Sequence, residues 1–197
     1  MKKMLMFIML IIVISISSYV IQVREPTGAA IYSFKDGLKE VRDVEKKFNF
    51  DQGYPEPLDD KWAMLGQLSN IKNYVENLPK SEDINALYAY IHFRTRELSS
   101  KISFQTATKY KLNLIKDGAL LCPQKPYFLA RIRHFNESIR LGAEAIDYLK
   151  TFINQYPEYV EHTDIPISLP RLLEAQYYEM EKLRFNEETS IMNTCFS

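Results

Sequence analysis

The segment PYFLARIRHFNESIRLGAEAIDYLKTFINQYP, residues 126–157, decides the fold class of this chain. Its apolar side chains recur at alternating spacings of four and three residues, which is the pattern of an α-helix with one buried face. Pro126 suits the first turn of a helix, and Pro157 lies just beyond the last apolar position. The pattern therefore predicts one long helix bounded by two prolines, with this apolar stripe: Phe128, Ile132, Phe135, Ile139, Gly142, Ile146, Leu149 and Ile153.

The same spacing recurs upstream in two neighbouring segments. Residues 64–78 carry a stripe that ends before Pro79, and a further stripe over residues 84–102 follows Ser81. Serine followed by acidic residues is typical of a helix N-terminus. Because two helices joined by so short a turn pack antiparallel, residues 59 to about 108 predict a helical hairpin.

Two weaker stripes complete the helical pattern, one over residues 34–48 and one over residues 169–183. A polar residue occupies one slot in each stripe, Glu45 in the first and Gln176 in the second. We expect both to lie at helix edges that are exposed to solvent. Since no segment shows the alternation of a strand, the sequence predicts an all-α protein.

Residues 4–23 contain no charged side chain and consist mainly of apolar ones. At 1.5 Å per residue, about twenty residues cross a hydrocarbon core of about 30 Å. Lys2 and Lys3 precede the segment, which favours a cytoplasmic amino terminus and a domain outside. We therefore predict a single-pass membrane protein that contacts lipid through this segment. The alternative is a cleaved signal peptide, which would release a secreted domain.

The predicted architecture is an N-terminal transmembrane helix followed by a four- to five-helix bundle. The anchor occupies residues 1–24, a juxtamembrane helix and linker occupy residues 25–58, and the bundle domain occupies residues 59–197. In an exported domain, Cys122 and Cys195 would form a disulfide, whereas in the cytosol they would be small buried thiols.

The charge balance and the missing motifs of this sequence argue against several classes of function. The 25 basic and 25 acidic residues balance, so there is no basic excess for nucleic-acid binding. Glu-x-x-His metal motifs are missing, because Ala89, Arg131 and Tyr159 stand three residues before the histidines at 92, 134 and 162. Phosphate-binding loops and nucleophile elbows are absent too. The sequence therefore predicts no metal site and no cofactor.

The expected function is binding: an envelope, adaptor or sensor-like interaction protein without intrinsic catalysis and with an unidentified protein or envelope-component partner. A loop with aromatic side chains can anchor a partner or ligand, which makes Tyr156, Tyr159 and His162 the candidate surface. The alternative is a helical enzyme whose acid and base come from separate helices. His134 and Glu137, one helical turn apart, and His162 are the residues that this alternative would use.

Residues 145–157, AIDYLKTFINQYP, resemble the second helix of a tetratricopeptide repeat. The resemblance implies a cytosol-facing adaptor whose concave face binds a peptide or protein. It also requires the chain to turn near Gly142, between the two helices of the repeat. The helical stripe described above runs through this position without a break.

Overall fold

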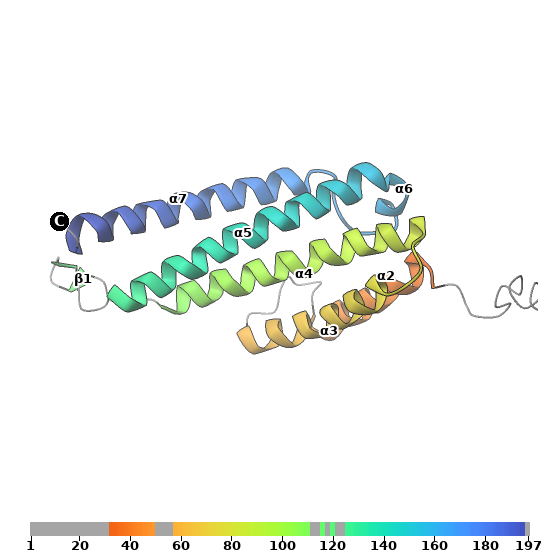
Figure 1. The fold of residues 1–197 in the computed structure, drawn as a ribbon, viewed down its shortest axis with the longest axis horizontal. Coiled ribbons are helices and arrows are strands. Elements are labelled where there is room, and N and C mark those ends of the chain that lie inside the picture. Colours follow the sequence, from red (N-terminus) through yellow and green to blue (C-terminus); the bar gives the residue numbers. More distant parts are fainter. Residues whose placement is uncertain (1–31, 50–56, 111–114, 117–118, 121–124, 196–197) are drawn as a thin grey trace, which may run out of the picture. The chain divides into compact units, whose positions relative to one another are not determined.

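The computed structural model of this chain describes residues 32–49, 57–110, 115–116, 119–120 and 125–195. Its helices are α2 (Phe34–Lys47), α3 (Leu58–Glu76), α4 (Glu82–Lys109), α5 (Lys125–Gln155), α6 (Pro157–Val160) and α7 (Leu169–Cys195) (Figure 1). Two-residue strands, β1 (Ile115–Lys116) and β2 (Ala119–Leu120), pair antiparallel. The predicted helical bundle is confirmed. The sequence predicted no strand, since pairs of this length are too short to show a period.

The described helices include none that is both long and apolar enough to cross a membrane. Residues 4–23, which carry the predicted anchor, lie outside the described residues. The anchor therefore stays a prediction.

Helix α5 is the helix that the segment at residues 126–157 predicts. It begins at Lys125, ends at Gln155 and runs without interruption through Gly142. The turn that the tetratricopeptide resemblance requires is thus missing, and that interpretation is wrong. Most of the predicted stripe is buried, while Ile139 and Ile153 are only half-buried.

The predicted helical hairpin is confirmed by α3 and α4, which pack against each other. Ser81 caps α4, since its hydroxyl accepts a hydrogen bond from the Ile84 amide at 3.2 Å. Helix α4 also packs against α2 and α5, so it lies in the middle of the bundle (Figure 1). Consequently α4 is buried on nearly all sides, not only along the single stripe that the sequence indicated.

Helix α2 belongs to the same compact unit, which extends from Ser33 to Ser197. Its stripe residues Phe34, Leu38 and Val41 are buried against the hairpin. Gly37 allows this approach, because a Cβ atom there would come within 2.1 Å of a methyl carbon of Leu87. The helix linking the predicted anchor to the bundle is therefore part of the core.

The expectation that Glu45 is exposed is wrong. Its side chain is 12% exposed and accepts a hydrogen bond from Nε of Arg94 at 2.8 Å. Arg94, 8% exposed, also donates through Nη1 to Glu97 at 3.2 Å. Because α4 lies in the middle of the bundle, its arginine meets a carboxylate from α2 where the stripe suggested solvent. Gln176, the other polar slot, is exposed as expected.

Helix α7 packs mainly on α5. Arg131 of α5 donates from Nε and Nη2 to the two carboxylate oxygens of Glu187, each at 2.7 Å, and from Nη1 to the Ala107 carbonyl at 3.0 Å. This bidentate pair joins the C-terminal half of α7 to α5 and to the end of α4.

Removing the arginine of the buried ion network should destabilise the bundle. Arg94→Met leaves the carboxylates of Glu45 and Glu97 buried without their guanidinium, so we expect a loss of about 3 kcal/mol or more in the free energy of unfolding. Urea denaturation followed by circular dichroism measures it. Arg140→Met, which breaks the exposed pairs with Glu137 and Glu144, is the control and should cost less than about 1 kcal/mol. Equal losses of unfolding free energy in Arg94→Met and Arg140→Met would contradict the assignment of Arg94 to a stabilising buried ion network.

Candidate functional site

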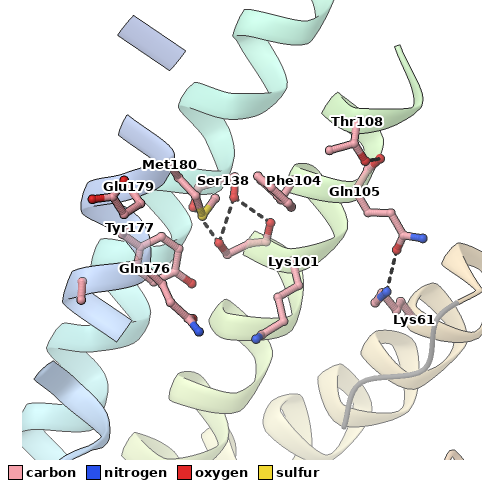
Figure 2. A pocket seen from close by; sticks show the side chains of 12 residues that line it. Lys61, Lys101, Phe104, Gln105, Thr108, Ser138, Gln176, Tyr177, Glu179 and Met180 are labelled. Atoms are coloured by element: carbon pink, nitrogen blue, oxygen red, sulfur yellow. Dashed lines mark hydrogen bonds between the residues drawn. The ribbon is translucent and has the colours of Figure 1, made fainter. Parts of the chain in front are cut away.

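A groove of about 830 Å³ lies between α7 on one side and α3 and α4 on the other, with α5 behind it (Figure 2). This volume is in the range of ligand-binding pockets. Four helices contribute the lining residues: Lys61, Ser100, Lys101, Phe104, Gln105, Thr108, Ser138, Ala175, Gln176, Tyr177, Glu179 and Met180.

The floor of the groove is the contact between α4 and α5 at two serines. The Ser100 hydroxyl donates to the Ser138 carbonyl at 2.8 Å, and the Ser138 hydroxyl donates to the Ser100 carbonyl at 2.9 Å (Figure 2). Both side chains are buried. Since each hydroxyl finds its partner in the facing backbone, the floor exposes few polar groups to the groove.

The α7 wall is formed by the aromatic ring of Tyr177 and by its neighbours Gln176 and Met180. Tyr177 packs on Gly142 so closely that a Cβ atom there would lie 2.1 Å from a ring carbon. Burial raises the pKa of Tyr177 to about 12, with a hydrogen bond to Ser100 acting in the opposite direction. The tyrosine is therefore a neutral, mostly apolar part of the wall at physiological pH.

The opposite wall combines an aromatic ring with two lysines. Phe104 of α4 faces the groove (Figure 2). Lys61 of α3 is only 8% exposed, and its ammonium donates to the Gln105 side-chain oxygen at 2.6 Å. Lys101 Nζ lies 3.5 Å from a carboxylate oxygen of Glu97, which is a long ion pair. This wall therefore combines two positive charges and the polar side chains of Gln105 and Thr108 with the apolar ring of Phe104.

One residue of the candidate surface after α5, Tyr159, makes contacts within the bundle. The Tyr159 hydroxyl donates to Asp83 Oδ1 at 2.6 Å, and Oδ2 of the same carboxylate accepts from the Phe34 amide at 3.1 Å. The hydrogen bond to Asp83 and burial raise the pKa of Tyr159 to about 12. The ring of Tyr159 packs on Phe34. Tyr159 therefore connects α6 to the N-termini of α2 and α4.

The other two residues of that candidate surface are more accessible. Tyr156 is half-buried with its ring against Tyr159, and His162 is exposed. The backbone carbonyl of His162 accepts a hydrogen bond from Arg42 at 2.8 Å, beside a small hollow of α2. None of the three residues lines the groove.

Two residues of the enzyme alternative, His134 and Glu137, lie in a second hollow, of about 920 Å³, between α3, α4 and α5, whereas His162 lies elsewhere, beside the small hollow of α2. Glu137 receives two hydrogen bonds from Arg140, at 2.7 and 3.0 Å, which hold the pKa of its carboxyl below its usual range. The His134 ring stacks on Tyr110. Glu137 is thus engaged by an arginine, and the described part of the chain shows no hydrogen bond between it and His134.

The structure also bears on metal ligands and cysteines. Over the described ranges, no three His, Cys, Asp or Glu side chains come together as a metal site requires. Cys195, at the end of α7, is half-buried and disulfide-bonded. Cys122 lies outside the described residues.

His92 of α4 is the most unusual titratable group that the structure describes. It is 6% exposed, lies between the rings of Tyr88 and Tyr148, and neither ring nitrogen has a hydrogen-bond partner within the described residues. Burial lowers the pKa of His92 to about 4, and the charges of Lys72 and Arg96 act in the same direction, against Glu76. The fold therefore holds this histidine in its neutral form.

This histidine should make stability depend on pH. The unfolded chain binds the proton near pH 6.5 and the folded chain near pH 4, so the free energy of unfolding should fall as the pH is lowered between these values, by at most about 3 kcal/mol. Denaturation at a series of pH values measures the slope. His92→Phe should remove this part of the slope, and the same change at exposed His162 is the control. A slope that is as large in His92→Phe as in the unchanged protein would contradict the assignment of this pH dependence to His92.

No protein-family model, no curated protein and no solved structure matches this chain. The groove is therefore identified as the candidate site from its geometry and lining residues alone.

Sequence reasoning did not identify the groove. Its lining residues come from four helices, and the sequence singled out only Gln176, as the polar slot of the stripe over residues 169–183. A signal existed in Ser138, a small residue on the buried side of α5, because such residues mark places where helices approach closely.

Proposed function

We propose that this protein is a membrane-anchored, extracytoplasmic binding protein, of the envelope, adaptor or sensor-like kind, whose groove takes an elongated apolar group. The observation that carries the proposal is the groove itself, where Phe104, Tyr177 and Met180 line a space of about 830 Å³. Apolar surface left open to water favours an occupant that removes it from water.

The extracytoplasmic position is supported by two independent features. Residues 4–23 are long and apolar enough for an anchor, with Lys2 and Lys3 before them. Cys195 is disulfide-bonded, and such bonds persist in oxidising compartments. An apolar occupant fits a domain that is tethered beside a lipid surface.

Binding without catalysis is supported by the chemistry of the lining. Burial keeps Tyr177 protonated, and the serines of the floor donate to backbone carbonyls, so neither has a base that would activate it. Lys61 and Lys101 each have a polar partner in the bundle. These groups are suited to holding and orienting a ligand.

Photo-crosslinking tests the proposal directly. A photoreactive phenylalanine analogue replaces Gln176, which lines the groove, in the full-length protein expressed in cells. After irradiation, we expect a covalent adduct at this position, because an occupant would lie against it. Intact mass and peptide mapping measure the adduct.

The control carries the same photoreactive residue at Lys182, which is exposed on α7 and does not line the groove. This position should give no specific adduct. Equal yields at both positions, or no adduct at residue 176, would exclude an occupied groove and with it the proposed function.

A further inference from the structure

We infer that the groove binds a single-chain amphiphile with an anionic head group, of the fatty-acid class. The inference rests on the proposed function and names its ligand. In this arrangement the carboxylate lies at Lys101 and Gln176, and the chain lies along Phe104, Tyr177 and Met180.

Two donors that suit a head group lie together at one end of the groove, whose remaining lining mixes apolar and polar side chains. In Figure 2, the ammonium of Lys101 and the side-chain amide of Gln176 lie at the same end, whereas Phe104 and Met180 lie at the other. An ammonium and an amide N–H are donors that suit a carboxylate. A ligand whose carboxylate lies at Lys101 and Gln176 and whose chain covers Phe104 and Met180 is amphiphilic, with its polar group at a terminus.

The charges that border the groove favour an anion. Lys61 and Lys101 bring two positive charges to one wall, where Lys101 is also paired with the carboxylate of Glu97. Glu179, the carboxylate among the lining residues, is exposed and points away from Lys101 (Figure 2). In apolar surroundings, a charge interacts more strongly with an opposite charge than it does in water. The positive wall therefore selects a negative head over a neutral one of the same size.

A head group at Lys101 would approach an ammonium that already has partners in the bundle. The ion pair of Lys101 with Glu97 is 3.5 Å long, and the other oxygen of Glu97 already accepts from Arg94. A bound carboxylate would therefore share Lys101 with a carboxylate that keeps a second cationic partner.

The length of the groove suits a single chain. From Lys101 to Thr108 the lining follows α4 for about 10 Å, roughly two helical turns. Burying each methylene against this wall stabilises a complex by about 0.8 kcal/mol, a contribution that grows with chain length. An elongated hydrocarbon gains this stabilisation along the full wall.

Photoaffinity labelling tests the head-group assignment. Full-length protein in phosphatidylcholine nanodiscs is irradiated with palmitic acid that carries a diazirine in its chain, and peptide mapping locates the adducts. We expect them on the α4 and α7 peptides that line the groove. Hexadecanol with the same diazirine should label these peptides about tenfold less, because it lacks the negative charge.

The matched variants are Lys101→Met, which removes the head-group partner, and Lys109→Met, an exposed position on the same helix that does not line the groove. Labelling by the acid should fall about tenfold in Lys101→Met and stay unchanged in Lys109→Met. Thermal unfolding of both variants checks that the bundle is intact.

The outcomes distinguish the ligand assignment, an anionic amphiphile, from the proposed function, a groove that binds an apolar occupant. Equal groove labelling by acid and alcohol, unaffected by Lys101→Met, would overturn the anionic head group and leave an apolar-ligand groove standing. A protein cross-linked at residue 176 in cells, with no groove labelling by either probe, would overturn the amphiphile and support a protein occupant. Labelling by neither probe, together with no adduct at residue 176, would contradict both the amphiphile assignment and the proposed binding function.

Discussion

The reciprocal hydrogen bonds between Ser100 and Ser138 are the constraint on which the rest of this structure depends. They hold α4 and α5 together at a point where both side chains are small and buried. A larger residue at either position would separate the helices, since a packed interior has no room for added volume. The same contact forms the floor of the groove, because small side chains leave space above them. The small size of Ser100 and Ser138 therefore explains both the close packing of α4 on α5 and the open groove above this contact.

Placing α4 in the middle of the bundle determines where its polar residues go. A helix covered by α2, α3 and α5 has no fully solvated face, so each polar side chain needs a partner or must be neutral. Arg94 has partners, because it forms ion pairs with Glu45 and Glu97. His92 is instead held in its neutral form between two tyrosine rings. The buried ion network also fixes α2 against α4, because a misplaced α2 would leave charges unpaired in the core.

How well the sequence predicted each helix depends on how many neighbours the helix has. Helix α5 still exposes one face, so its stripe and its bounding prolines were visible, and so was the hairpin of α3 and α4. The single stripe assigned to α4 missed buried residues on its other faces, since periodicity disappears when a helix is covered all round. Glu45 was misjudged for the same reason. The groove could not be predicted, because it depends on which side chains from four helices face one another, and spacing within one helix does not contain that information.

The one-sided packing of α7 explains why the space beside it remains open. Tyr177 sits on Gly142 of α5, and Arg131 pairs with Glu187 farther along, so both attachments bind α7 to α5. Seated in this way, α7 presents Met180 and Gln176 across the groove from Lys101 and Phe104. Moving α7 inward to close the groove would bring its apolar side chains against Lys101, whose side chain is 34% exposed, and cost the hydration of its ammonium. An occupant that is apolar along its length and negative at its end covers the same surface while pairing the charge. The lysine that disfavours closure of the bundle is therefore the group that would favour a negatively charged ligand.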